Sequence, residues 1–298
     1  VMSFMMLVMI YMLLPQAQVS AERINEVLDR RASVREGSVT AGKETGSVEF
    51  RSVSFRYPHA SEDALSDISF RVERGETLAI IGATGCGKTT LVSLIPRFYD
   101  ATAGEVLVDG VNVRDYAFDA LYDKLGYVTQ KAVLFSGSLR ENVFFGESAA
   151  SDNEDDFRTA VEVSQAKEYV DKLPEGAEHR VAQLGRNLSG GQKQRLSIAR
   201  ALARKPEILI FDDSFSALDY RTDAMLRAGL NERLAGTTKI IVAQRISTIR
   251  HADRIIVLDR GAAVGIGTHD ELMKTCDVYR EIALSQLSAE ELVDGRCS

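Results

Sequence analysis

The chain has no excess of positive charge, although it carries many charged residues. Its 298 residues include 36 Lys and Arg against 43 Asp and Glu, which gives a formal net charge of −7 at pH 7. Domains that bind nucleic acid usually present a basic surface and a high isoelectric point, so the composition counts against nucleic acid as a partner. The apolar fraction of 45% is that of a folded protein with a sizeable core.

Cysteine and histidine are scarce, and their spacing suits neither disulfides nor a metal centre. The three cysteines, Cys86, Cys276 and Cys297, form no C-x-x-C pair, which fits a reducing compartment such as the cytosol. Of the four histidines, His59, His179 and His251 share no metal-ligand spacing, and His269 is interpreted as a helix-start residue. We interpret Cys86 as a residue tolerated in its loop rather than a reactive thiol.

The apolar run that opens the chain, residues 1–14, is shorter than the about 20 residues that cross a membrane. We interpret residues 1–18 as the end of a transmembrane helix that begins outside this sequence, followed by a helical extension and linker over residues 19–47. The alternative is a secretory signal with a small-residue cleavage site at residues 19–21. A secretory signal has a positively charged segment before its apolar run, however, and no Lys or Arg precedes the run here.

Residues 77–91, TLAIIGATGCGKTTL, hold the motif around which the chain is organised. A buried strand over residues 78–81 leads into the spacing G-x-x-x-x-G-K-[ST]. Its glycines let backbone N–H groups approach a phosphate closely, Lys88 adds a positive charge, and Thr89 carries the hydroxyl that such loops place on Mg²⁺. The stretch predicts a phosphate-binding loop before a helix; the alternative is a plain glycine-rich turn.

Two later stretches carry related chemistry. Residues 188–192, LSGGQ, place a Ser hydroxyl, two Gly N–H groups and a helix N-terminus in succession, which predicts a second anion cradle. Residues 208–211, ILIF, predict a buried strand that ends at Asp212, where phosphate-loop enzymes place a carboxylate for Mg²⁺. Asp213 follows directly. Loop, cradle and carboxylate in this order predict a nucleotide site.

Apolar strands alternate with helical segments along the chain, and this alternation predicts an α/β fold. Asp109-Gly110 predicts a hairpin turn, and the alternation over residues 48–57 shifts phase near residues 51–52. Strands are expected over residues 48–57, 68–72, 77–81, 104–108, 126–129, 207–211, 239–243, 254–258 and 261–267. Helices are expected over residues 88–98, within 139–173 (broken by an acidic, Ser-rich loop over residues 148–156), after LSGGQ up to Pro206, and over 269–287.

These motifs together resemble the ATP-binding cassette family, specifically the nucleotide-binding domain of exporter-type ABC transporters. The resemblance runs from about Ser20 to Gln286. It rests on FRYP with Tyr57, GATGCGKT as Walker A, YVTQ with Gln130 as the Q-loop, LSGGQ as the signature, ILIFDD as Walker B and SALD (residues 216–219) as the D-loop. It implies a P-loop NTPase core with a mixed sheet, an N-terminal antiparallel β subdomain and a helical subdomain at about residues 131–203. The domain would span residues 48–287, with a tail at 288–298.

The resemblance also implies ATP and Mg²⁺ as ligands and a head-to-tail pair of cassettes, with each ATP between one chain's Walker A and the other chain's signature. Thr89, Gln130 and Asp212 would hold Mg²⁺, and Gln130, Asp213 and Gln244 would act in hydrolysis. The residues expected to bind the nucleotide are Tyr57 on the adenine, Gly82, Ala83, Thr84, Gly85, Cys86, Gly87, Lys88, Thr89, Thr90 and, toward the other chain's ATP, Ser189, Gly190, Gly191 and Gln192.

Two positions depart from the family pattern. Asp213 stands where the family has a Glu that orients or deprotonates the attacking water, and Gln244 stands where it has a His that contacts the γ-phosphate. Asp is one methylene shorter than Glu, and Gln cannot hold a proton at neutral pH. We interpret the pair as the degenerate site of a heterodimeric exporter, whose intact signature completes a competent site on a different chain. The alternative is drift without consequence at both positions.

The sequence thus predicts the ATPase cassette of an exporter for a multidrug-like or lipid-like substrate. Its own transmembrane domain would lie in the cell membrane and the cassette on the cytoplasmic side. One alternative is a soluble ABC ATPase that acts on nucleic acid or the ribosome, but no second cassette, long coiled-coil insertion or basic tail is present. The other is a regulatory subunit that binds nucleotide without turnover.

Overall fold

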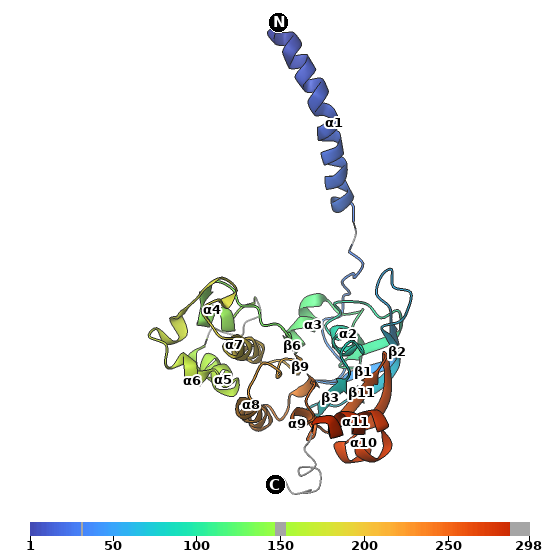
Figure 1. The fold of residues 1–298 in the computed structure, drawn as a ribbon, viewed down its shortest axis with the longest axis vertical. Coiled ribbons are helices and arrows are strands. Elements are labelled where there is room, and N and C mark those ends of the chain that lie inside the picture. Colours follow the sequence, from blue (N-terminus) through green and yellow to red (C-terminus); the bar gives the residue numbers. More distant parts are fainter. Residues whose placement is uncertain (31, 147–152, 287–298) are drawn as a thin grey trace. The chain divides into compact units, whose positions relative to one another are not determined.

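The computed structural model describes residues 1–30, 32–146 and 153–286, and the chain divides into two compact units, Val1–Arg35 and Glu36–Ser298 (Figure 1). The first unit is helix α1 (Met2–Leu28), which buries none of its residues and contains Pro15. By length and composition alone, α1 is the one helix in the described part of the chain that could cross a membrane. It runs without a break through residue 18. The expected tail at 288–298, Cys297 and residues 148–152 of the acidic loop lie outside the described residues.

A mixed six-stranded sheet forms the centre of the second unit, in the order β12-β11-β3-β10-β9-β6. Neighbouring strands are parallel except for β12, which is antiparallel to β11. The strands are β3 (Thr77–Gly82), β6 (Leu125–Val128), β9 (Ile208–Asp212), β10 (Thr238–Val242), β11 (Arg254–Asp259) and β12 (Ala262–Gly267). Parallel strands connected by helices are covered on both faces, which explains their continuous apolar runs.

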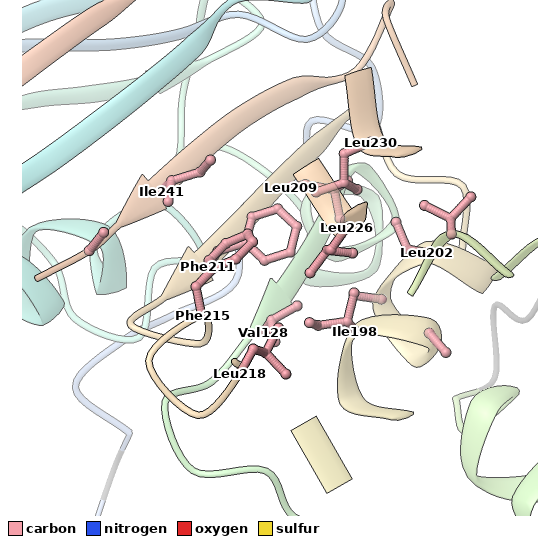
Figure 2. Close-up of a cluster of buried hydrophobic side chains, with 14 of the residues drawn as sticks. Val128, Ile198, Leu202, Leu209, Phe211, Phe215, Leu218, Leu226, Leu230 and Ile241 are labelled. Carbon is pink, nitrogen blue, oxygen red and sulfur yellow. The ribbon is translucent and has the colours of Figure 1, made fainter. Parts of the chain in front are cut away.

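Alternate residues of β9 enter two different cores, because successive strand side chains point to opposite faces. Leu209 and Phe211 pack on the face covered by α7 (Gly190–Ala203) and α8 (Tyr220–Arg233), as Figure 2 shows. Ile208 and Ile210 belong to the core on the other face, which they share with residues of the antiparallel sheet. The predicted α/β core with a buried Walker B strand is confirmed.

The antiparallel sheet has the order β2-β1-β4-β5. Its strands are β1 (Val48–Phe55), β2 (Leu65–Val72), β4 (Ala103–Val108) and β5 (Val111–Asn112). The phase shift expected near residues 51–52 is a bulge, with Ser52 at φ +46°. Asp109 and Gly110 have φ of +52° and +70°, the left-handed pair that a tight hairpin turn needs, so the predicted hairpin between β4 and β5 is confirmed.

A group of helices lies beside β6 and β9 in Figure 1 and falls within the expected helical subdomain. Its elements, besides α7, are β7 (Gly137–Ser138), α4 (Leu139–Val143), α5 (Glu154–Val163), α6 (Lys167–Val170), η1 (Gly176–Glu178), β8 (Arg180–Val181) and η2 (Gln183–Gly185). The remaining helices of the second unit are α2 (Lys88–Ser93), α3 (Phe118–Lys124), α9 (Ile246–Ile249), α10 (His269–Thr275) and α11 (Asp277–Gln286).

Two of the expected helices have different bounds. The helix expected over 88–98 ends at Ser93, because Pro96 disfavours helical backbone in the residue before it and Arg97 adopts φ +57°. The helix expected over 269–287 is two helices, α10 and α11. Cys276 between them is extended, with φ −122° and ψ 106°.

Candidate functional site

Two glycines of the Walker A loop, Gly82 and Gly87, are required by close packing at the end of β3. A Cβ at Gly82 would lie 2.1 Å from the carbonyl oxygen of Leu258, and a Cβ at Gly87 would lie 2.9 Å from that of Ala64. Gly87 also adopts φ +104° as it begins α2. The loop therefore turns tightly from strand to helix and leaves its backbone N–H groups at the N-terminus of α2, where an anion is stabilised.

The side chain of Lys88 folds back over this loop. Its Nζ donates hydrogen bonds to the carbonyl oxygens of Gly82 and Ala83, each at 2.8 Å, and lies 3.8 Å from the Sγ of Cys86. Lys88 and Cys86 are both buried. The positive charge is thus held inside the phosphate cradle by the backbone that forms it.

Two oxygen ligands suited to Mg²⁺ lie together beside the loop. The Thr89 hydroxyl donates to Asp212 Oδ1 at 2.8 Å, and the Tyr127 hydroxyl donates to Asp212 Oδ2 at 3.2 Å. Asp212 is buried, and this burial raises the pKa of its carboxyl group. A hard divalent cation prefers such oxygen ligands and would offset the cost of the buried charge, so the residues fit Mg²⁺.

The described residues hold no cluster of three or more His, Cys, Asp or Glu able to bind a metal by themselves. Mg²⁺ would therefore need nucleotide oxygens or water in addition to Thr89 and Asp212, as in other phosphate-loop enzymes.

The carboxylate of Asp213 is held by two glutamines. Gln130 Nε2 donates to Asp213 Oδ2 at 2.9 Å, and Gln244 Nε2 donates to the same oxygen at 2.6 Å. Gln130 follows β6 by two residues, Asp213 follows β9 and Gln244 follows β10 by two residues. These strands are neighbours with the same direction, so the residues after their carboxyl ends meet at one edge of the sheet. The structure brings the three expected hydrolytic residues together.

A cavity of about 540 Å³ contains most of the predicted site. Predicted residues that line it are Tyr57, Thr84, Gly85, Gly87, Lys88, Thr89, Thr90, Gln130, Asp213 and Gln244. Three polar residues that the sequence did not single out also line it, namely Glu62, Asp63 and Arg260. Tyr127, which binds Asp212, was missed as well, although it stands in the YVTQ motif that named Gln130.

Tyr57 lies at the rim of the cavity and is 37% exposed. Its hydroxyl shares a hydrogen bond with Thr90 Oγ1 at 2.9 Å, and its ring meets the rings of Phe55 and Tyr99 edge to face. These contacts fix the ring where an adenine could lie against it. Stacking on a base stays a prediction.

The signature lies apart from this cavity. Ser189 accepts a hydrogen bond from Gln192 N and forms a capping box with its side chain at the start of α7. Ser189 and Gly190 are exposed, and a Cβ at Gly190 would meet no atom within 4 Å. None of residues 189–192 is among the described residues that line the cavity. The structure therefore brings the Walker residues together but leaves the signature facing outward.

The fold and site define a P-loop nucleotide-binding domain with an inserted helical subdomain that carries the signature. The family model described as ABC transporter matches residues 65–216. The chain belongs to the ABC transporter family, and the described fold is that of its ATP-binding domain.

Three known proteins show the extent of the similarity. An uncharacterized ABC transporter ATP-binding protein of Mycobacterium tuberculosis is 44% identical over 289 residues, which cover 96% of this chain and 49% of that protein. The ATP-dependent lipid A-core flippase of Pseudomonas aeruginosa is 42% identical over 253 residues, 85% of this chain and 42% of the flippase. A bacterial Atm1-family ABC exporter solved with ATP bound has a TM-score of 0.86 at 32% identity, covering 95% of this chain and 50% of that one. The chain spans about half the length of the curated relatives it matches.

Proposed function

We propose that this chain binds ATP with Mg²⁺ and serves as the ATP-hydrolysing cassette of an exporter. The observation that carries the proposal is that Lys88 and Thr89 line one cavity and that the Thr89 hydroxyl donates a hydrogen bond to the buried carboxylate of Asp212. Lys88 and the loop N–H groups would bind the phosphates. Thr89 and Asp212 would hold Mg²⁺, which would neutralise phosphate charge.

The attachment to a membrane domain is supported by the relatives and by an exposed aromatic surface. Two of the three similar proteins named above are a flippase and an exporter about twice as long as this chain, and α1 is long and apolar enough to cross a membrane. We infer a membrane location with the cassette on the ATP-containing cytoplasmic side. The lipid A-core flippase supports a lipid-like cargo, and a similar putative multidrug export protein of Bacillus subtilis supports a multidrug-like one.

A groove of about 450 Å³ beside β6 offers a place for that domain to dock. Phe98, Phe135 and Phe145 line it and are 51%, 44% and 50% exposed. The Arg200 guanidinium lies 5.6 Å and 5.5 Å from the ring centroids of Phe135 and Phe145. Exposed aromatic groups in such a cluster are typical of an interface. We assign the groove to a cytoplasmic segment of the chain's own membrane domain in the longer protein.

The side chains at positions 213 and 244 support a slow site. Both glutamine amides donate to the Oδ2 oxygen of Asp213 and hold its carboxylate in place, but this carboxylate is one methylene shorter than the family's Glu. Gln244 supplies a neutral donor in place of a titrating imidazole. A carboxylate displaced by about 1 Å can lower a rate about 100-fold. We infer that this site retains ATP with little turnover and that the outward-facing signature completes a faster site on a different half-transporter.

Nucleotide binding is tested with Lys88→Ala, because removing the buried ammonium takes a positive charge out of the phosphate cradle. We expect the ATP dissociation constant to rise at least about tenfold, as a charge-assisted hydrogen bond is typically worth 1.5–3 kcal/mol. Lys172→Ala is the control, since Lys172 is exposed and pairs only with Glu168 on the surface among the described contacts. Unchanged affinity in Lys88→Ala would refute the nucleotide site.

The slow-site proposal is tested by restoring the family residues. In single-turnover assays with labelled ATP, the Asp213→Glu, Gln244→His double variant should hydrolyse at least about tenfold faster than the parent, because it returns the longer carboxylate and the imidazole. ATP affinity should stay the same. If the parent chain alone already turns over as fast as the double variant, the degenerate site and the need for a different partner are both wrong.

A further inference from the structure

Gln286 is the last described residue. Both polar atoms of its side-chain amide form hydrogen bonds with the segment that carries Gln244. Its Nε2 donates to the carbonyl oxygen of Gln244 at 2.7 Å, and its Oε1 accepts a hydrogen bond from the N–H of Ile246 at 2.9 Å. The amide therefore spans three consecutive residues of a loop that lies 40 residues earlier in the chain. Such a two-point contact fixes both the position and the orientation of the peptide groups.

One of these hydrogen bonds satisfies the backbone N–H of Ile246 at the start of a helix. Helix α9 begins at Ile246, and its N-cap residue, Arg245, makes no side-chain capping bond. The first N–H groups of a helix need partners from outside it. Gln286 Oε1 supplies one of them from α11, so α11 caps α9 in place of a local Ser, Asp or Asn.

Buried side chains hold helix α11 in place, and with it the Gln286 contact. Tyr279 and Ala283 on its inner face are both fully buried, and the Tyr279 hydroxyl lies 2.7 Å from Nδ1 of His269 on α10. On the other side, the residue before Gln244 is tied to the central sheet, because Ala243 N donates to Ile80 O at 3.1 Å. The loop with Gln244 is thus held from β3 at one end and from α11 at the other.

The loop contacts the nucleotide site through the side chain of Gln244. The Gln244 side chain donates to Asp213 Oδ2 at 2.6 Å, so a shift of the Gln244 backbone moves or breaks that bond. Gln286 lines a second cavity, of about 670 Å³, which shares Asp213 and Gln244 with the nucleotide cavity. Gln286 itself is not among the described residues lining the nucleotide cavity, and its hydrogen bond to the Gln244 carbonyl is the contact that connects it to a residue of that cavity.

We propose that Gln286 is a positioning residue for ATP hydrolysis, which aims the Gln244 amide at Asp213 by clamping the loop between β10 and α9. The inference rests on the proposed function of this site. It makes α11, the last described helix, part of the hydrolytic apparatus, although no sequence motif marks it.

The test compares Gln286→Met, which keeps length but loses both hydrogen bonds, with Ser285→Ala. Ser285 is the exposed neighbour on α11, and its hydroxyl donates only within that helix among the described contacts. We expect Gln286→Met to lower the single-turnover hydrolysis rate about tenfold with unchanged ATP affinity, since small misplacements cost rate rather than binding. Ser285→Ala should match the parent. An equal rate in Gln286→Met and the parent, or a loss confined to ATP affinity, would overturn the proposal.

Two further readouts separate positioning from general stability. If Gln286 acts through Gln244, adding Gln286→Met to Gln244→Ala should cause no further loss, whereas two independent effects would multiply. Amide hydrogen exchange at Ile246 should be faster in Gln286→Met than in Ser285→Ala while β9 and β10 keep their protection. Unchanged exchange at Ile246 would refute the clamp even in a protein with no turnover. Failure of the parent to bind ATP would instead refute the proposed function and leave the exchange result standing.

Discussion

The hydroxyl of Thr89 donates a hydrogen bond to the carboxylate of Asp212 at 2.8 Å, although 123 residues separate them in the chain. Thr89 lies in the first turn of α2, after β3, and Asp212 ends β9. Strand β10 lies between β3 and β9 in the sheet. The bond therefore spans the carboxyl edge of three strands and places the hydroxyl and the carboxylate where one cation could contact both.

Asp212→Asn should stabilise the protein without ligands and weaken Mg²⁺-dependent ATP binding. Burial raises the pKa of Asp212 above its ordinary 3.8, so the folded protein binds this proton more tightly than the unfolded chain. The group's stabilising contribution is present at low pH and is lost as the pH rises through the raised pKa. At pH 7 the buried charge is a cost that Asn removes.

We expect Asp212→Asn to raise the melting temperature at pH 7 by a few degrees, as about 1 kcal/mol corresponds to about 2–4 °C in a domain of this size. The difference from the parent should shrink as the pH falls toward the ordinary carboxyl pKa. ATP affinity in Mg²⁺ should fall about tenfold or more, while affinity in EDTA changes little. A lower melting temperature at pH 7 would contradict this account.

Substitutions of Tyr57 separate the ring from the hydroxyl. Tyr57→Phe keeps the ring and loses only the bond to Thr90, so ATP affinity should stay within about threefold, since one neutral hydrogen bond is worth about 0.5–1.5 kcal/mol and this one is half exposed. Tyr57→Leu removes the aromatic face and should weaken binding about tenfold. Inorganic triphosphate, which has no base to stack, should bind all three proteins alike. If the affinity for triphosphate fell together with the affinity for ATP, the ring would not act by stacking on the base.

An ion network around the buried Asp109, at the opposite end of β9, should govern stability rather than chemistry. Lys124 Nζ lies 2.6 Å from Asp109 Oδ2 and 2.9 Å from Glu207 Oε2, and Asp109 is fully buried. Lys124→Met leaves Asp109 as an uncompensated buried charge, so urea unfolding should show a loss of about 3–5 kcal/mol.

Asp109→Asn combined with Lys124→Met should recover part of that loss, because both buried charges of the pair are then gone. Lys172→Met, in the exposed pair with Glu168, serves as the control and should leave the urea midpoint unchanged. A double variant no more stable than Lys124→Met alone would show that packing of the Lys124 stem, and not charge, holds this region.

Candidate residues that follow an apolar strand lie together in the structure, as their place in the sequence predicts. Asp212, Asp213, Gln130 and Gln244 each come after such a strand, and parallel neighbours bring their carboxyl ends to one edge. The convergence of these residues thus follows from strand order alone.

Contacts between residues without motifs could not be predicted in this way. The amide of Gln286, the hydroxyl of Tyr127 and the pairing of Lys124 with Asp109 depend on which side chains meet after the chain has folded. The predicted end of the helix over residues 88–98 was wrong for a local reason. The pattern there is apolar enough for a helix, but it contains Pro96.

The outward-facing signature has a consequence for how this protein should be measured. Ser189 and Gly190 are exposed at the N-terminus of α7, and the N–H groups of such a first turn can bind phosphate oxygens only if another molecule presents them. In the proposed pairing, part of the binding free energy of each ATP comes from contacts with a second protein molecule. The apparent affinity should then depend on the concentration of protein as well as of nucleotide, so a titration at dilute protein would understate the strength of the assembled site.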